Sequence, residues 1–203
     1  MKSQQSPTTM QKCLAAIFTL ILVVLIGSYF YFDHYYSREA TADRFIVAIE
    51  KNDARTVASI VRTDDADLKI TPRSVQPLIT YYQNHPNQRA KLKRQMTSTG
   101  IVNDHLDFVD SGHHFFLFEK YLLETKAVFP TIKSSQDNVQ VKVNGKVVAR
   151  SLNRNVTRTF GPYIPGRYKV ELTVYRHHHT KKITRTVDWL NPTKTDLRIR
   201  EIR

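Results

Sequence analysis

The sequence is poor in cysteine and carries no catalytic signature. Cys13 is the only cysteine among 203 residues, which excludes a disulfide framework and a zinc site built from cysteines. The chain also lacks a Gly-x-Ser-x-Gly elbow, a phosphate-binding glycine loop and a His-Glu-x-x-His helix. We therefore expect a protein that is not an enzyme, with no cofactor and no bound metal. Its low cysteine use fits a surface protein of a Gram-positive bacterium.

Long hydrophobic runs are equally scarce, with one exception. Residues 13–32, CLAAIFTLILVVLIGSYFYF, contain no charged side chain. A helix rises about 1.5 Å per residue, so these twenty residues match the roughly 30 Å hydrocarbon core of a bilayer. The run therefore predicts a transmembrane helix.

The run differs from a cleaved secretory signal. It is longer than the roughly 7–15 apolar residues of a signal peptide, and it ends in aromatic residues from Tyr29 to Phe32 instead of small ones. Aromatic side chains at that level are typical of an interfacial belt. Two lysines and no acid precede the run, so the positive-inside rule places residues 1–12 in the cytoplasm as a short tail. We expect an uncleaved anchor in the plasma membrane, with the remaining residues outside.

Positive charge is concentrated in the C-terminal third. Residues 133–203 contain sixteen Lys and Arg against five Asp and Glu, which is +11 of the net +13, whereas residues 38–132 contain thirteen against twelve. Such a field attracts polyanions, which outside a Gram-positive cell are teichoic acids and anionic lipids; nucleic acid is not expected there. A merely solvated basic surface is the alternative. The candidate polyanion-binding residues are Lys142, Lys146, Arg150, Arg154, Arg158, Arg167, Lys181 and Lys182.

Residues 33–112 are predicted to form a small helical domain and a linker. Apolar residues recur at spacings of three and four between Arg38 and Lys51, as on one face of a helix. Asp53 is suited to cap a second helix, and Thr71-Pro72 is a start signal for a third. The polar, turn-rich residues 98–112 mark the boundary of this domain.

Residues 113–203 are predicted to form a basic antiparallel β-sandwich. Val139–Val143 alternates apolar and polar residues and is followed by Asn144-Gly145, the strongest short signal for a hairpin. Arg167–Arg176 alternates in the same way, and further strands follow it. The expected fold class is α+β, with an N-terminal transmembrane helix, a small extracellular helical domain and then the sandwich.

Three groups of polar residues have simpler interpretations than a metal or acid–base site. The aspartates of residues 64–67 lack the glycine and distal glutamate of an EF-hand, which favours a solvated turn. His177–His179 lie in a predicted turn without a carboxylate ligand, which favours an exposed turn over a zinc or copper site. The aspartates between residues 104 and 110 fall in the expected linker.

Several segments resemble the TcaA/YvbJ family of single-pass, teicoplanin-resistance-associated envelope proteins of Gram-positive bacteria. They are RFIVAIEKNDARTVASIV, ITPRSVQPLITYY, FFLFEKYLLETKAVFPTIKSS, and VQVKVNGKVVARS with FGPYIPGRYKVELTV. The last pair also resembles PEGA-type surface sandwiches. Members of the family commonly begin with a cytoplasmic zinc ribbon and continue into further extracellular domains; twelve residues before the span leave no room for the ribbon.

The resemblance implies a non-enzymatic envelope protein linked to cell-wall or antibiotic stress. Combined with the basic C-terminal third, it favours a sensor or organiser that binds anionic wall polymer, lipid or another envelope protein through the β-domain. The alternative is a structural accessory subunit of a larger membrane complex. The resemblance transfers no catalytic residue.

Overall fold

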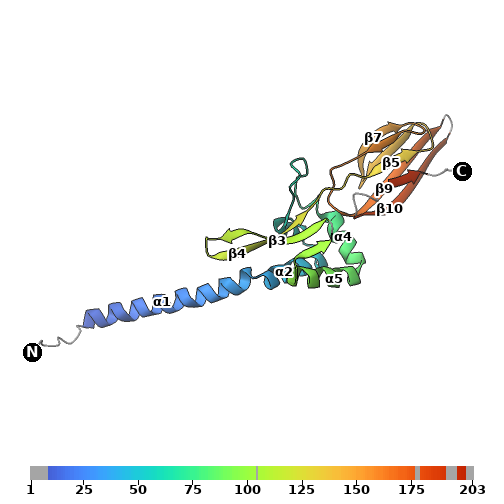
Figure 1. Cartoon of the computed structure of the whole chain (residues 1–203). Helices are drawn as coiled ribbons and strands as arrows, with labels where there is room; N and C mark the ends of the chain where they lie inside the picture. The colour runs from blue at the N-terminus through green and yellow to red at the C-terminus, as the bar shows by residue number, and fades with distance from the viewer. Residues whose placement is uncertain (1–8, 104, 177–178, 191–195, 200–203) are drawn as a thin grey trace, which may run out of the picture.

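The computed structural model describes residues 9–103, 105–176, 179–190 and 196–199. A long helix stands at one end, an α+β domain lies in the middle and a β-sandwich stands at the far end (Figure 1). This arrangement is the α+β fold that the sequence predicts, with an apolar N-terminal helix, further helices and β-sheets.

Helix α1, Thr9–Tyr36, contains the predicted span. None of its described residues is buried by the rest of the chain. Its mean hydropathy reaches 2.5 over an 18-residue window, and among the described residues it is the one helix long and apolar enough to cross a membrane. Its apolar side chains lack a protein core to cover them, which is the situation that a lipid environment resolves.

Two of the predicted helices form as expected. Helix α2, Arg38–Glu50, confirms the predicted amphipathic helix and is capped by Ser37, whose Oγ accepts from the Ala40 N–H. Helix α3, Ala54–Ile60, is capped by Asp53, as predicted. Hydrogen bonds from Thr56, first from its hydroxyl and then from its backbone, lower the pKa of Asp53.

The third helix begins later than predicted. Thr71 and Ser74 exchange hydrogen bonds within a turn, and helix α4, Gln76–Asn84, starts only after it. Pro77 occupies its first turn, where the missing N–H costs nothing. Helix α5, Pro86–Thr97, follows directly.

A mixed four-stranded sheet completes the middle domain, in the order β1-β4-β3-β2. The helices pack against this sheet, and one hydrophobic core joins them. The strands are β1 (Val61–Arg62), β2 (Ile101–Asn103), β3 (Leu106–His114) and β4 (Phe118–Thr125).

The first two strands after the helices differ from the sequence prediction. The segment expected to be a linker, residues 98–112, contains β2 and most of β3, and the expected boundary after residue 112 falls inside β3. Leu106 and Phe108 point into the helical core, which turns this polar-looking segment into a strand of the middle domain. Two buried residues in alternation are enough to fix one face of a strand.

The sandwich consists of two facing sheets, in the orders β10-β9-β6-β7 and β11-β5-β8. Their inner faces share a second hydrophobic core. The strands are β5 (Thr131–Ser134), β6 (Val139–Val143), β7 (Lys146–Leu152), β8 (Thr157–Thr159), β9 (Gly166–Arg176), β10 (His179–Trp189) and β11 (Asp196–Ile199).

The predicted hairpin at Asn144-Gly145 is confirmed between β6 and β7. Both residues have positive φ, 46° and 80°, which is the geometry that Asn-Gly adopts most readily. One pairing departs from the expected antiparallel sheet, because β11 runs parallel to β5.

The two domains meet where β9 begins. Ile164, just before β9, is 1% exposed and lies in the core of the middle domain. The backbone of Gly166 approaches α4 so closely that an added Cβ would lie 2.4 Å from the carbonyl carbon of Pro77 and 2.6 Å from the amide nitrogen of Leu78. The sandwich is therefore packed directly onto α4.

This contact predicts that Gly166→Ala destabilises the chain. The new methyl group meets backbone atoms, which cannot move aside as a side chain can, so we expect a loss of about 1–3 kcal/mol in the free energy of unfolding. Denaturation of the full chain in detergent micelles measures the loss. Gly27→Ala is the matched control because nothing lies within 4 Å of the added Cβ; equal stability of the two variants would contradict the packing argument.

Candidate functional site

A groove of about 580 Å³ lies beside the contact between the two domains. One wall comes from α4 and the turn before it, and the other from β9, β10 and the β6–β7 turn. Its lining combines cations with amides and hydroxyls and, among the described residues, includes no carboxylate. The lining residues are Arg73, Gln76, Pro77, Thr80, Asn84, Asn144, Arg167, Tyr168, Lys169 and Thr186.

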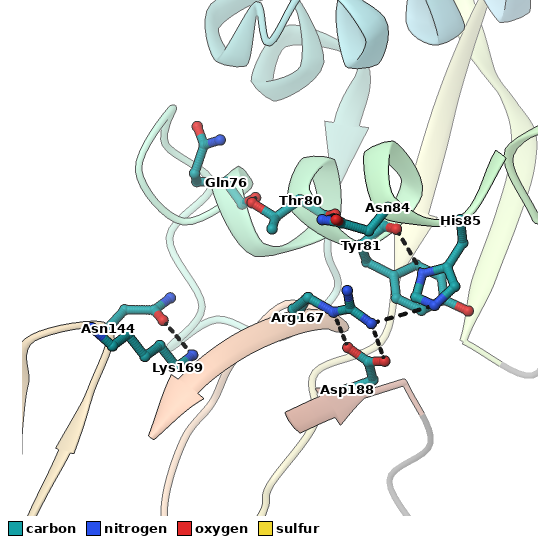
Figure 2. A network of polar contacts seen from close by, with 9 residues as sticks. All are labelled: Gln76, Thr80, Tyr81, Asn84, His85, Asn144, Arg167, Lys169 and Asp188. Carbon is teal, nitrogen blue, oxygen red and sulfur yellow. Dashed lines mark hydrogen bonds and ion pairs between the residues drawn. The ribbon is translucent and has the colours of Figure 1, made fainter. Parts of the chain in front are cut away.

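Arg167 is the central charged residue of this groove. Its Nε and Nη2 atoms donate to the two carboxylate oxygens of Asp188 at 2.7 and 2.8 Å, a bidentate pair between β9 and β10. Nη2 also donates to Nε2 of His85 at 3.3 Å, across the domain boundary (Figure 2). The hydrogen bonds that Arg167 donates to Asp188 raise the pKa of Arg167. One guanidinium thus ties the edge of the sandwich to the end of α4.

The hydrogen bonds of His85 define its tautomer. A guanidinium can only donate, so Nε2 of His85 accepts from Arg167 and Nδ1 carries the proton that it donates to the Tyr81 carbonyl oxygen at 2.9 Å. The centroids of the Tyr81 and His85 rings lie 4.4 Å apart. Burial, followed by the charge of Asp188, raises the pKa of the Tyr81 hydroxyl. Tyr81 and His85 do not line the groove, but they hold the guanidinium of Arg167, which does.

Asn144 fixes the opposite wall. Its Oδ1 accepts from the Lys169 N–H at 2.8 Å, and its own N–H donates to the Lys169 carbonyl oxygen at 2.8 Å (Figure 2). These two bonds hold the β6–β7 turn against β9. The turn residue that makes the hairpin therefore also shapes the groove.

The cations of the groove differ in how far they are neutralised. Lys169 lies 3.1 Å from Glu171, which Lys182 also contacts at 2.9 Å. Hydrogen bonds from these two lysines, with Lys182 first, lower the pKa of Glu171. Arg73 is exposed and, among the described residues, has no carboxylate within 4.0 Å. Arg73 therefore contributes the least compensated positive charge.

An apolar pocket of about 500 Å³ adjoins the groove. The two share Arg73, Pro77, Asn144 and Tyr168, so they form neighbouring compartments on either side of the β6–β7 turn. Lys146 stands at the rim of the apolar pocket. A ligand that reaches from one compartment into the other meets charged, polar and apolar surface in turn.

The eight cations predicted from the sequence do not converge on one patch. Lys142, Arg167 and Lys182 share the outer face of the four-stranded sheet, whereas Lys181 lies on the opposite face of β10. Arg167 alone of the eight lines the groove, and Lys146 alone lines the apolar pocket.

The remaining three cations lie elsewhere on the sandwich. Arg150 and Arg158 line a separate concavity along β7, with the Arg158 guanidinium 5.9 Å from the ring centroid of Phe160. Arg154 pairs with Asp137 at 3.6 Å. The charge of the C-terminal third is thus spread over several faces.

Sequence reasoning missed Arg73 and Lys169 at the groove. Lys169 had a usable signal, because it is two residues from Arg167 in an alternating strand and must share its face. Arg73 had none, since its position depends on how α4 packs against Gly166.

In the part of the chain that the structure describes, the other polar groups singled out in the sequence lie in local turns. Among the described residues, no three His, Cys, Asp or Glu side chains are close enough to hold a metal ion. Asp65 accepts from the Asp67 N–H, and Asp110 from the Gly112 N–H, as in local turns. His177, His178 and Asp104 lie outside the described residues.

These features define a membrane protein with one N-terminal apolar helix, a small α+β domain and a β-sandwich. Residues 38–125 match the family model described as the TcaA protein second domain. These bounds begin at α2 and end at β4, so the matched region is the middle domain. No solved structure matches the chain.

The chain is also similar to the uncharacterised membrane protein YvbJ of Bacillus subtilis (strain 168). The two are 26% identical over 148 residues, which cover 73% of this chain and 24% of YvbJ. The chain thus spans about a quarter of that relative's length. The domain match and this similarity both support the resemblance to the TcaA/YvbJ-like family that the sequence segments indicate.

The pair Arg167–Asp188 predicts measurable coupling at the groove. Its side chains are 24% and 32% exposed and bind in bidentate geometry. A double-mutant cycle with Arg167→Ala and Asp188→Ala should therefore give a coupling free energy of about 0.5–1 kcal/mol, which decreases as salt is added. Unfolding of the full chain in detergent micelles provides the four free energies. The pair Arg154–Asp137, 59% exposed on both sides, serves as the control and should show almost no coupling; equal coupling in both pairs would contradict this account.

Proposed function

We propose that the chain is a non-catalytic, plasma-membrane-anchored envelope protein that binds anionic wall polymer at the groove between its two domains. In this proposal α1 is an uncleaved anchor, its N-terminal end faces the cytoplasm and both folded domains lie outside. The membrane-protein family and the apolar helix support the anchor. The excess of lysine before the span supports the orientation.

The chemistry of the groove lining is the observation that carries the proposal. Arg73, Arg167 and Lys169 are suited to phosphate, and the surrounding amides and hydroxyls are suited to the hydroxyl groups of a polyol or sugar. A polymer of alternating phosphate and polyol units presents both. Teichoic acids have this chemistry. The amides of Gln76 and Asn84 each already donate one N–H, to Asn52 Oδ1 and to the Thr80 carbonyl oxygen, so a polyol would meet their remaining N–H and carbonyl groups.

The carboxylates next to the groove limit the expected affinity. Asp188 and Glu171 already neutralise part of the charge of Arg167 and Lys169. A phosphate must therefore compete with them, or bind first at Arg73. Such a site favours many weak contacts along a polymer over tight capture of one phosphate, which suits a sensor or organiser at the wall.

The resemblance to teicoplanin-resistance-associated proteins suggests the biological setting. Binding of wall polymer would report on the state of the wall, or would hold the protein where the wall is under stress. The sandwich and the groove supply the contact in this proposal, and α1 supplies the location.

A salt titration of polymer binding tests the proposal. The full chain is placed in nanodiscs of neutral lipid, and binding of a purified poly(glycerol phosphate) teichoic acid is measured against ionic strength, with neutral dextran as the control polymer. We expect the logarithm of the binding constant to fall linearly with the logarithm of salt concentration, because bound phosphates release counterions. Binding that does not change with salt concentration, or equal binding of dextran, would overturn the proposal.

Two variants locate the contact. Arg73→Ala with Lys169→Ala removes two groove cations, and the slope of the salt dependence should decrease by roughly 0.7 for each lost phosphate contact. Arg154→Ala removes an exposed cation away from the groove and is the charge-matched control for each single change. Equal effects of all changes would indicate a diffuse field and would contradict a groove site.

Crosslinking distinguishes the alternative role. A stoichiometric protein partner that co-purifies in mild detergent, together with no binding of the polymer, would favour a structural accessory subunit of a larger membrane complex.

A further inference from the structure

The turn between β3 and β4 exposes three large apolar side chains in succession. Phe115, Phe116 and Leu117 are 72%, 98% and 66% exposed. None of them belongs to either hydrophobic core. Three consecutive exposed apolar residues at a loop tip are unusual for a surface that meets only water.

The backbone of this turn adopts a conformation that bulky residues disfavour. Leu117 N–H donates to the His114 carbonyl oxygen at 3.1 Å, which closes the turn, and its central residues Phe115 and Phe116 have φ of 51° and 64°. Turns with two positive φ values normally use Asn-Gly, and Asn144-Gly145 does so in this same chain. The chain therefore keeps two phenylalanines at the tip against the local backbone preference.

The strand ends that flank this turn pack on the C-terminal end of α1. Phe118 is 6% exposed, and its ring centroid lies 5.6 Å from that of Tyr29 and 5.8 Å from those of Phe32 and Tyr36. His114, the cross-strand partner of Phe118, stacks on Tyr36 at 4.3 Å. Figure 1 shows the hairpin running alongside α1, with its tip toward the N-terminal side of that contact. The level of the tip relative to the membrane is thus fixed by the helix.

That level corresponds to the membrane interface. The aromatic residues that contact Phe118 end the apolar run of α1, where aromatic side chains mark the boundary between hydrocarbon and water. Tyr29 and Tyr36 are seven residues apart, or about 10 Å along a helix. The tip continues past Phe118 along the same helix, so it lies at the depth of those last turns or deeper.

Two basic side chains, Lys120 and Arg44, lie near the tip end of the hairpin, together with the carboxylate of Glu119, which accepts from the Tyr121 hydroxyl. Lys120 follows Phe118 on β4, and Arg44 of α2 sits over the Tyr35 ring at 4.1 Å. Burial, followed by the charges of Lys120 and Arg44, lowers the pKa of His114. An apolar tip with cations behind it is the pattern of a segment that enters a phospholipid surface.

We propose that the tip of the β3–β4 hairpin is a second membrane-contact element, in which Phe115, Phe116 and Leu117 insert into the interfacial layer of the bilayer beside α1. The occupant of this surface is lipid. The middle domain then touches the membrane at two points, and its orientation on the membrane is set. This inference does not depend on polymer binding at the groove.

Tryptophan fluorescence tests the insertion. The full chain with Phe116→Trp is placed in nanodiscs that contain lipids brominated at shallow or deep acyl positions, and the unsubstituted chain supplies the background from Trp189, which is 2% exposed in the sandwich core. We expect the added emission to be shifted to shorter wavelength and to be quenched most by the shallow bromines. Tyr175→Trp, an exposed aromatic position in the sandwich, is the control and should show neither effect. Equal behaviour of the two variants would overturn the proposal.

A second variant separates insertion from folding. Phe115→Asn with Phe116→Gly removes both aromatic side chains and introduces the residues that this turn prefers, so thermal stability should be kept or increased. A nitroxide at Leu117→Cys, in a Cys13→Ser background, then reports depth by its relative exposure to oxygen and to a water-soluble nickel complex. We expect a shift toward the aqueous signal in the Asn-Gly variant. An aqueous signal in both backgrounds, or a crosslink from this cysteine to a second copy of the chain, would overturn the lipid assignment.

Discussion

The contact between Gly166 and the start of α4 is the constraint on which the rest of the structure depends. Because the glycine has no side chain, the first residue of β9 lies against the backbone of Pro77 and Leu78. Ile164 is drawn into the core of the middle domain two residues earlier, and Arg167 is carried to His85 one residue later. Three residues within a four-residue segment therefore supply an apolar anchor, a close backbone contact and a polar tie. The groove exists because these contacts hold its two walls together.

The same constraint explains which features could be predicted from the sequence. The span, α2, the Asp53 cap and the Asn144-Gly145 hairpin depend on residues close together in the chain, and local patterns identify them. Residues 98–112 could not be assigned correctly, because their strand character comes from packing against helices that lie before them in the sequence. The groove could be anticipated only in part, through Arg167 and its strand neighbour Lys169, since the position of Arg73 follows from how one domain docks on the other.

Charge distribution in the sandwich shows why composition alone is a poor guide to a binding site. The C-terminal third is strongly basic, yet Arg167, Lys169 and Lys182 each contact one of two carboxylates. Two of these pairs link β9 to β10 and the third, Lys169–Glu171, lies within β9. All three lie on the outer face of the sheet and reduce the positive field that these cations would otherwise create. The groove is therefore distinguished from the rest of the sandwich surface by its combination of cationic, amide and hydroxyl groups. The number of positive charges matters much less.

The close seating of β9 on α4 also has a mechanical consequence. The sandwich stands at the end of the molecule away from α1, and the middle domain between them contacts both (Figure 1). A force applied to the sandwich would therefore reach α1 through packed surfaces and not through a flexible linker. A sideways pull on the sandwich would therefore exert a torque on α1 about the place where the β3–β4 hairpin packs on the aromatic end of that helix.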